Sequence, residues 1–487
     1  MSETQSLADT ALSLDVLVIG AGISGINTAY RLQSQLPHIK FNILEGRNAI
    51  GGTWDLFKYP GIRSDSDLHT FGFEWHPWPH ENPIAEGPLV ISYLHDAVAT
   101  HGLEKHIHFR HKVLSANWSS KSQRWTVVAE HDGHIKSYTA RFLILGTGYF
   151  DYDTPLKTET PGLQNFKGKI IHPQMWPEDY DYSNKKMVII GSGATAVTLL
   201  PNLMKKAASV TMLQRSPTYI IARTNRSPAW LREFVPRPVL SVYERLLFMT
   251  VPYLFYVLCM YFPNMMRAFL RQQTINQLPQ RISFDPHFKP LYNPWEQRMC
   301  LAPDGDFYQA LHDPRANIVT SRIKTVTEHE IHLLNGRTLE ADVIITATGL
   351  RVMIGGGISL TVDGEKVNIA DKMLWNGTMI QDIPNMFYMI GYTNASWTLG
   401  ADNSAFLFVR MLKHMAHTQA TVLVSRKPQH MDATQPVFTL TSTYMRKAYE
   451  CLPKCGTQRP WTPRTNPVAD HFYARWGSFA EGVEFTA

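Results

Sequence analysis

Two glycine-rich turns, each directly after an apolar strand-like segment, constrain the fold of this 487-residue chain more than any other feature. The first follows Leu14–Ile19 and has the sequence GAGISG, and the second follows Met187–Ile190 and has the sequence GSGATA. A glycine turn between a strand and a helix is typical of a βαβ unit that binds a dinucleotide. Because the turns lie about 170 residues apart, more than one such unit spans, the sequence predicts two nucleotide-binding domains.

The first turn has the spacing G-x-G-x-x-G and precedes a predicted helix at Ile26–Gln35. Its glycines are Gly20, Gly22 and Gly25. They let the backbone approach a pyrophosphate, while the helix N-terminus supplies free N–H groups and a favourable dipole. A second predicted strand, Phe41–Leu44, ends in Glu45, where an acid accepts hydrogen bonds from a ribose diol. We assign this site to FAD.

The second turn has the spacing G-x-G-x-x-A and carries Gly191, Gly193 and Ala196. The strand predicted next, Ser209–Leu213, leads into Gln214, Arg215 and Ser216 instead of an acid. An acid would repel a 2′-phosphate, whereas a guanidinium binds one with two hydrogen bonds. The sequence therefore favours NADPH over NADH, bound by Arg215 and Ser216.

The fold class that follows is α/β, with two Rossmann-like domains and a helical insertion. Two predicted strands, Phe142–Leu145 and Val343–Ile345, run into glycine-bearing ends that we interpret as crossings between domains. We expect the FAD domain to contain residues 1–150 and 349–487, the NADPH domain residues 151–223 and 296–348, and the insertion residues 224–295.

The insertion contains Leu246–Phe262, a stretch of 17 residues without a charge. A membrane span is rejected because it would place the two halves of the NADPH domain on opposite sides of a bilayer. The stretch is also interrupted by Pro252 and is shorter than the roughly 20 residues of a span. Two interpretations remain: a buried helix, which we favour, or a helix in the membrane interface.

Composition places the chain among globular proteins, with a net charge of +6 and no basic run that indicates nucleic acid. Its four cysteines are too few for a disulfide framework, and the spacing of Cys451 and Cys455 matches neither a redox nor a zinc motif. The first residues carry no signal pattern. We expect a cytoplasmic protein without a metal.

Two longer motifs resemble the type I Baeyer–Villiger monooxygenases. The first, F-x-G-x-x-x-H-x-x-x-W-P, is matched by Phe166, Gly168, His172, Trp176 and Pro177. The second, G-G-x-W-x-x-x-x-Y-P-G-x-x-x-D, is matched by Gly51, Gly52, Thr53, Trp54, Tyr59, Pro60, Gly61 and Asp65. Segments such as IGSGATAVTLLPNL and MIGYTNASWTL are similar to the bacterial ethionamide-activating subgroup.

The resemblance implies roles at matching positions. Gly52, Thr53, Trp54 and Asp65 are expected in the flavin site, and Arg298 is expected to be the catalytic arginine, tuned by Asp65. The motif residues Phe166, Gly168, His172 and Trp176 are expected to couple NADPH binding to domain rotation. One departure is Gln297, where much of the family has a lysine that helps to hold the 2′-phosphate, which leaves more of the discrimination to Arg215.

The implied activity is the oxidation of ketones to esters by NADPH and O2 through a C4a-peroxyflavin, with side activity on sulfides and thioamides. The expected substrate is small and apolar, because the helical insertion is expected to wall the pocket. Two alternatives stay open: an N- or S-hydroxylating flavin monooxygenase, and a membrane-surface flavoprotein that binds or senses, suggested by Leu246–Phe262. A disulfide reductase is set aside because no C-x-x-C is present.

Overall fold

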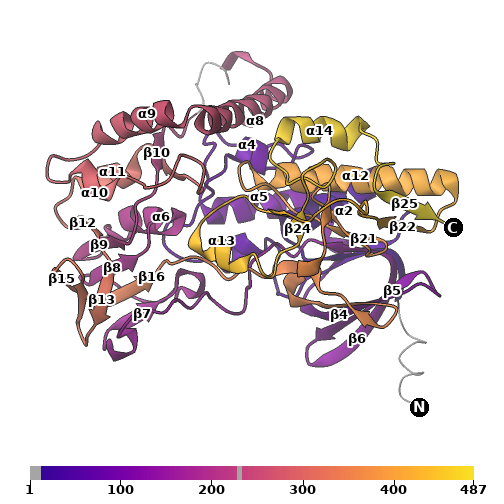
Figure 1. The fold of residues 1–487 in the computed structure, drawn as a ribbon, viewed down its shortest axis with the longest axis horizontal. Coiled ribbons are helices and arrows are strands. Elements are labelled where there is room, and N and C mark those ends of the chain that lie inside the picture. Colours follow the sequence, from indigo (N-terminus) through magenta and orange to yellow (C-terminus); the bar gives the residue numbers. More distant parts are fainter. Residues whose placement is uncertain (1–11, 227–232) are drawn as a thin grey trace.

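A computed structural model describes residues 12–226 and 233–487 and contains two large sheets, each with its own layer of helices (Figure 1). The larger sheet has the order β18-β17-β4-β5-β6-β1-β2-β3, with β21 beside β6. Its strands are β1 (Leu12–Ile19), β2 (Phe41–Leu44), β3 (Ile107–His108), β4 (His111–Ser119), β5 (Arg124–His131), β6 (His134–Leu145), β17 (Ser359–Val362), β18 (Glu365–Lys366) and β21 (Met386–Tyr388).

Side chains of β1 alternate between two apolar cores, as expected for a strand at the centre of a sheet. Val16 and Val18 pack in the core that also contains residues of α2 (Ile23–Gln35), α5 (Gly87–Thr100) and α12 (Trp397–Thr418). Leu17 and Ile19 pack on the opposite face. Both faces of β1 are therefore buried at Val16–Ile19, which explains the uninterrupted apolar run there.

The smaller sheet is fully parallel, in the order β12-β9-β8-β16-β7. Its strands are β7 (Lys169–Ile171), β8 (Lys186–Ile190), β9 (Ser209–Gln214), β12 (Ala316–Thr320) and β16 (Val343–Thr346), with α6 (Ala194–Leu203) after β8 and α11 (Asp306–Leu311) before β12. The predicted pattern of two strand–turn–helix units is confirmed. α2 begins at Ile23, three residues before the predicted start, because the last glycine of the motif already lies in the first helical turn.

Short elements connect and cover the two sheets. The helices are α3 (Thr53–Leu56), α4 (Leu68–Phe71), α13 (Thr443–Ala448) and α14 (Pro467–Trp476). A small three-stranded sheet consists of β13 (Ile323–Val326), β14 (Glu330–Leu333) and β15 (Thr338–Glu340). The two-stranded pairs are β19 (Leu374–Trp375) with β20 (Met379–Ile380), β22 (Val422–Ser425) with β25 (Val483–Thr486), and β23 (Gln435–Pro436) with β24 (Lys454–Cys455).

The chain crosses between the sheets twice, and the two crossings run side by side. The amide of Asp151, after β6, donates to the carbonyl of Arg351, after β16, at 2.8 Å. The hydroxyls of Thr158 and Thr348 lie 3.0 Å apart. After the second crossing the chain rejoins the larger sheet, where β17 pairs with β4 and β21 pairs with β6.

The predicted insertion contains the helices α8 (Arg237–Tyr261), α9 (Pro263–Ile275) and α10 (Phe284–His287). It is bracketed by β10 (Ile220–Arg223) and β11 (Cys300–Pro303), which pair in parallel. The favoured interpretation of Leu246–Phe262 as a buried helix is wrong, because only 22% of the apolar window of α8 is buried. By length and composition α8 is also apolar enough to cross a membrane, which is weak evidence by itself.

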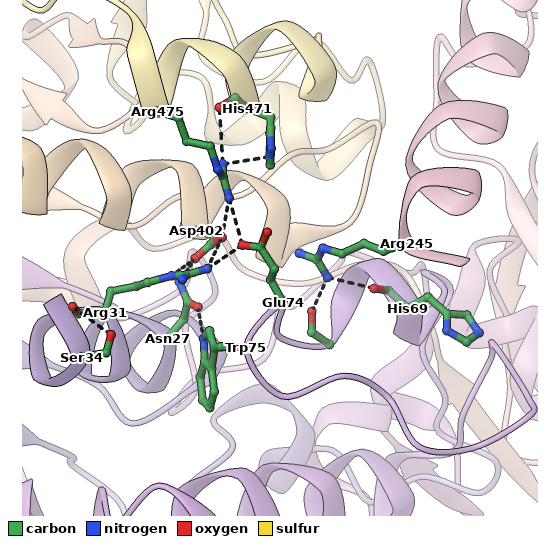
Figure 2. A network of polar contacts seen from close by, with 11 residues as sticks. Asn27, Arg31, Ser34, His69, Glu74, Trp75, Arg245, Asp402, His471 and Arg475 are labelled. Carbon is green, nitrogen blue, oxygen red and sulfur yellow. Dashed lines mark hydrogen bonds and ion pairs between the residues drawn. The ribbon is translucent and has the colours of Figure 1, made fainter. Parts of the chain in front are cut away.

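A buried polar network ties the C-terminal helices to the first βαβ unit (Figure 2). Arg31 of α2 donates two hydrogen bonds of 2.9 Å to Asp402 of α12 and one of 2.8 Å to Glu74. Arg475 of α14 donates to the same Glu74 at 2.9 Å. Because a buried charge is costly unless it is paired, this network fixes α12 and α14 on the larger sheet.

Candidate active site

One cavity of about 910 Å³ touches both glycine turns. Its wall includes Gly22 to Ser24 at the start of α2 and Gly191 to Thr195 at the start of α6. Of the other predicted site residues, Thr53, Trp54, Asp65, Arg215, Ser216 and Arg298 also line it. The structure therefore brings together residues that lie more than 200 positions apart in the sequence.

The first turn is closed on the side away from the cavity. A Cβ atom at Gly25 would lie 1.9 Å from the carbonyl oxygen of Gly20, so only glycine fits there. Gly22, the N-cap of α2, has no side-chain cap, and a Cβ there would meet only the Cα of Gly52, at 3.9 Å. The uncapped N–H groups of a 13-residue helix thus end at a cavity, which fits a pyrophosphate.

Glu45 lies at the end of β2, buried behind the first turn. One carboxylate oxygen accepts the amide of Ala21 at 2.7 Å and the other accepts the amide of Arg47 at 2.9 Å. Burial raises the pKa of this carboxyl, and the two amide donors oppose that rise. Glu45 does not itself line the cavity; because an ionised carboxylate has about four acceptor positions, two remain beyond these amides.

The predicted flavin loop lies beside this turn. Thr53 and Trp54, in the short helix α3, line the cavity, whereas Gly52 sits behind them against the hydroxyl of Tyr152. The hydroxyls of Thr53 and Tyr152 are 2.9 Å apart. Trp54 packs edge-on against Phe71 of α4, with ring centroids 5.5 Å apart. These contacts hold an aromatic and a hydroxyl at the cavity wall.

The second turn is open at its middle glycine and tight at its first, where a Cβ at Gly191 would lie 2.2 Å from the carbonyl oxygen of Ala347. A Cβ atom at Gly193 would meet no atom within 4 Å, and the N-terminus of α6 has no side-chain cap. Ala196 occupies the place that Gly25 has in the first turn and is fully buried. The cavity wall here therefore consists of backbone N–H groups with free space in front of them, which again fits a phosphate.

Arg215 and Ser216 follow β9 and reach the same cavity. One guanidinium nitrogen of Arg215 donates to the hydroxyl of Thr443 in α13 at 2.9 Å. The carbonyl of Ser216 accepts the hydroxyl of Ser192, inside the glycine turn, at 2.8 Å. Arg215 thus joins the end of β9 to the C-terminal part of the chain across the cavity.

Arg322 is a second cation at this place that sequence reasoning missed. It follows β12, the neighbour of β9, and the amide of Ser321 donates to the carbonyl of Gln214 at 3.0 Å. Arg322 lines the cavity and is exposed. Arg322 could be recognised only from the pairing of β12 with β9, which brings the ends of the two strands together and cannot be inferred from a single sequence.

Arg298 approaches Asp65 on the cavity wall. Its guanidinium donates to the hydroxyl of Ser66 at 3.3 Å, next to Asp65 in the loop before α4. Burial raises the pKa of the Asp65 carboxyl, and the positive charges of Arg298 and Arg63 oppose that rise. Gln297, which stands where a lysine was expected, also lines the cavity.

The loop around Asp65 is anchored by two side chains that had no assigned role. Arg63 forms an ion pair with Asp306, at the start of α11, and donates to the carbonyl of Leu301 at 3.2 Å. Asp67 caps α4 by accepting the amide of Thr70 at 2.8 Å. Burial raises the pKa of Asp67 to about 6. Because these contacts fix the loop, Asp65 has a defined position rather than that of a solvated surface acid.

Aromatic side chains complete the wall near Arg298. Tyr149 stacks on Trp397, the first residue of α12, with ring centroids 5.0 Å apart. Burial raises the pKa values of Tyr149 and Tyr444, and the positive charge of Arg298, which lines the same cavity, opposes that rise in both. Aromatic rings therefore form part of the wall near Arg298, beside the polar side chains of Asp65, Ser66 and Gln297.

The fingerprint residues do not line the cavity. Phe166 and Trp176 are buried in two different apolar cores, and a Cβ at Gly168 would lie 2.3 Å from the carbonyl oxygen of Asp342. His172 caps the turn Pro173–Met175 by accepting the amide of Gln174 at 3.2 Å.

This segment contacts both crossings between the sheets. The side-chain amide of Gln174 donates to the carbonyl of Asp151, in the first crossing, at 2.7 Å. Burial lowers the pKa of His172, while the backbone of Gly349, in the second crossing, opposes that change.

The expectation that the helical insertion walls the pocket is not met directly. Among the described residues of the insertion, 224–226 and 233–295, none lines the cavity. Met249 of α8 instead packs against Tyr392 and Leu399, and Tyr392 lines the cavity. The insertion thus supports the wall from behind.

Comparison with known proteins agrees with this geometry. Residues 14–235 match the family model described as flavin-binding monooxygenase-like. The chain is 44% identical over 484 residues to the FAD-containing monooxygenase EthA of Mycolicibacterium smegmatis, covering 97% of both proteins.

Two solved structures share the fold. Cyclohexanone monooxygenase from Rhodococcus sp. Phi1 bound to NADP+ has a TM-score of 0.76 at 17% identity, covering 98% of this chain and 100% of that one. The complex of OTEMO with FAD and NADP has a TM-score of 0.70 at 20% identity, covering 86% of this chain and 88% of that one. At these identities the likeness establishes the fold.

The predicted α/β fold and the resemblance to monooxygenases of this architecture are thereby confirmed. So are the predicted enzyme class and the predicted cofactors, FAD and NADP, which the OTEMO structure contains together. The chain belongs to the family of flavin-binding, FAD-containing monooxygenases.

Proposed function

We propose that this monooxygenase converts small apolar ketones to esters and also oxygenates sulfides and thioamides. The overall change for a ketone is ketone + O2 + NADPH + H⁺ to ester + H2O + NADP⁺. The observation that carries the proposal is the position of Arg298, beside Asp65 and Ser66, on the wall of the cavity that both glycine turns share.

Arg298 acts as a fixed positive charge. A guanidinium stays protonated at any working pH, so it stabilises negative charge that develops on the oxygen of a substrate carbonyl. Asp65 and Ser66 orient it, and Arg63 keeps the loop that carries them in place. Because Asp65 is half-buried, its interaction with the guanidinium is screened less than that of a fully exposed pair.

The aromatic wall excludes water and prefers apolar substrates. Tyr149, Trp397 and Tyr444 line the same cavity as Arg298, and the phenols remain neutral because burial raises their pKa values. Bound FAD, once reduced, supplies the reaction with O2 from which one oxygen atom passes to the substrate. An apolar wall keeps water from competing in that transfer.

We assign the first turn, Gly20, Gly22, Gly25 and Glu45, with the loop Gly52, Thr53 and Trp54, to FAD. We assign Gly191, Gly193, Ala196, Arg215 and Ser216 to NADPH, with Arg322 as a further cation. Two uncapped helix N-termini that meet one cavity support this assignment.

We also propose that the fingerprint segment Phe166–Trp176 couples NADPH binding to domain movement. Its contacts with both crossings support the proposal, because any rotation of one sheet against the other must pass through those crossings. The strand pairing supports a division into FAD domain (1–150, 349–487), NADPH domain (151–223, 296–348) and helical insertion (224–295). All four cysteines are free, which supports a reducing compartment such as the cytoplasm.

The test is Arg298→Ala in the purified flavin-loaded enzyme, with Arg298→Lys beside it. We expect NADPH still to bleach the flavin, while ester formation from a methyl ketone falls by about 10² to 10³, the usual effect of removing an electrostatic stabiliser. The lysine variant restores part of the rate because it restores charge without the planar fork. Gas chromatography measures the ester.

Arg110→Ala is the control, because Arg110 is an exposed arginine paired with Asp132 and does not line the cavity. It leaves both reactions unchanged. Ester formation that survives in Arg298→Ala contradicts the assigned role. A wild-type enzyme that oxygenates only sulfur or nitrogen compounds contradicts the ketone chemistry and favours the N- or S-hydroxylating alternative.

A further inference from the structure

The helices α8 and α9 present an apolar face to solvent. Leu254 of α8 is 58% exposed and Phe262, between the helices, is 56% exposed. The exposed large apolar residues of the two helices and their junction are Val239, Val242, Tyr243, Leu246, Val251, Leu254, Leu258, Met260, Tyr261, Phe262, Met265 and Phe269. An exposed apolar surface of this extent marks an interaction site.

The orientation of α8 is fixed by polar contacts on its inner side. Arg245 donates to the backbone carbonyls of His69 and Gly72 at 2.9 and 3.0 Å, as Figure 2 shows. Glu244 lies 3.2 Å from the buried ring of His69. These are the only two charged residues between Arg237 and Arg267, and both are used on the inner side, so the outward face of α8 carries no charge between its ends.

The charges that border this face are positive. Arg237, Arg267 and Arg271 are exposed, and Glu244, the only acid within Arg237–Ile275, is buried. Arg267 donates to Asn293 at 2.6 Å, close to Leu291, which is almost fully exposed. Apolar and aromatic side chains bordered by arginine are the composition of a helix that lies in a membrane interface.

The C-terminal helix α14 extends the same face. It packs against α8, and Figure 1 shows α9, α8 and α14 along one edge of the molecule. Phe472 and Trp476 of α14 are exposed and stack with ring centroids 5.7 Å apart. Tryptophan at such a position is typical of side chains that reach the headgroup level. We call α8, α9 and these two residues of α14 the apolar face.

We propose that the apolar face docks on a bilayer surface that contains anionic lipid. The strands that bracket the insertion, β10 and β11, pair with each other, so the chain enters and leaves the insertion on the same side of the membrane. α8 therefore lies on the membrane without crossing it. A second copy of the chain fits less well: a two-fold contact would oppose equivalent patches whose exposed charges are all positive. Anionic headgroups complement those charges.

The experiment is co-sedimentation of the flavin-loaded enzyme with vesicles of phosphatidylcholine alone and of phosphatidylcholine with an equal amount of phosphatidylglycerol. We expect the protein to sediment with the anionic vesicles and to be released from them by high salt. Leu254→Glu lowers the partition coefficient about tenfold because a charge enters the apolar face. The double variant Arg267→Gln/Arg271→Gln lowers it at least about tenfold and weakens the salt dependence.

Leu334→Glu is the matched control, since Leu334 is 62% exposed after β14 and lies outside the apolar face. Flavin absorbance and the melting temperature confirm that each variant folds. Absence of binding to both vesicle types, or equal losses in Leu254→Glu and Leu334→Glu, overturns the proposal. So does a dimer in sedimentation equilibrium that Leu254→Glu dissociates while vesicle binding is absent. None of these outcomes bears on ester formation, so this proposal and the proposed function fail separately.

Discussion

The two glycine turns have the same chain path and differ in their surroundings. In the first, Gly25 is pressed against Gly20 and an acid, Glu45, closes the neighbouring strand. In the second, Ala196 replaces the last glycine and the neighbouring strand ends at a cation, Arg215. On the proposed assignment, the two turns share the backbone that binds pyrophosphate, and the charge after the next strand selects the nucleotide.

The comparison teaches that the two sites differ in the third position of the motif and in the charge that follows the next strand. We propose that the first site selects through its acceptors for a ribose diol, which suits a cofactor that stays bound. The second, with a cation and with space in front of Gly193, suits a 2′-phosphate that arrives and leaves with each turnover. Four predictions test this contrast.

The largest effect is expected from Gly25→Ala, because the added methyl would lie 1.9 Å from a backbone oxygen that cannot move without opening the turn. We expect the purified variant to retain less than about one tenth of the wild-type flavin. Its counterpart, Ala196→Gly, should keep its flavin and bind NADP⁺ within about a factor of three of wild type. Flavin absorbance and calorimetric titration give the two results. Equal effects of the two substitutions would show that the turns are equivalent.

Arg215→Ala comes next. Losing a charged donor to a phosphate costs about 1.5–3 kcal/mol, so the dissociation constant for NADP⁺ should rise about ten- to a hundredfold. The dissociation constant for NAD⁺ should stay nearly constant, because NAD⁺ lacks the 2′-phosphate. Thr443→Val, which removes the hydroxyl that Arg215 contacts, serves as the control and should have a small effect. Equal weakening of both nucleotides would contradict the assignment.

Glu45→Gln is expected to weaken FAD by about tenfold, since the amide accepts fewer hydrogen bonds from the ribose. The same residue predicts how FAD binding depends on pH. Burial raises the pKa of Glu45, so acidification protonates it before an ordinary glutamate, and FAD should dissociate as pH falls through that raised pKa. The glutamine variant should lose this dependence. Flavin fluorescence during an acid titration measures both, and unchanged acid release in the variant would exclude Glu45 as its cause.

The smallest effect is expected from Arg322→Ala. Arg322 is exposed, as Arg215 is, but it follows β12, which lies one strand further from the glycine turn than β9. We therefore expect its interaction with a phosphate to be worth only about 0.2–1 kcal/mol, and the dissociation constant for NADP⁺ should rise about two- to fivefold. NAD⁺ again serves as the comparison. An effect as large as that of Arg215→Ala would mean that Arg322 is the main 2′-phosphate ligand and that Arg215 serves chiefly to hold α13.

Much of the fold could be predicted because its signals are local. The strand at Phe41–Leu44 has the predicted bounds, and both glycine turns begin helices, since apolar runs and glycine spacing act over a few residues. The exposure of α8 could not be predicted, because an uncharged stretch has the same sequence whether it faces a core or solvent. That distinction depends on what the rest of the chain covers.

The candidate site divides in the same way. Gly22, Gly193 and Arg215 could be found because each lies at a fixed place after a strand. Arg63 and Arg322 were missed, since their importance comes from partners far along the chain, Asp306 for one and the end of β9 for the other. Residues that form such long-range contacts have no fixed spacing in the sequence, so a single sequence does not reveal them.

The most direct test of the account is the fate of the oxygen. Flavin-loaded enzyme is given NADPH, a medium-chain methyl ketone and ¹⁸O2, and the product is identified by mass spectrometry. The account predicts an ester that carries one ¹⁸O atom, with one NADPH consumed for each ester formed. NADPH consumption that yields only H2O2, with the ketone unchanged, would contradict it.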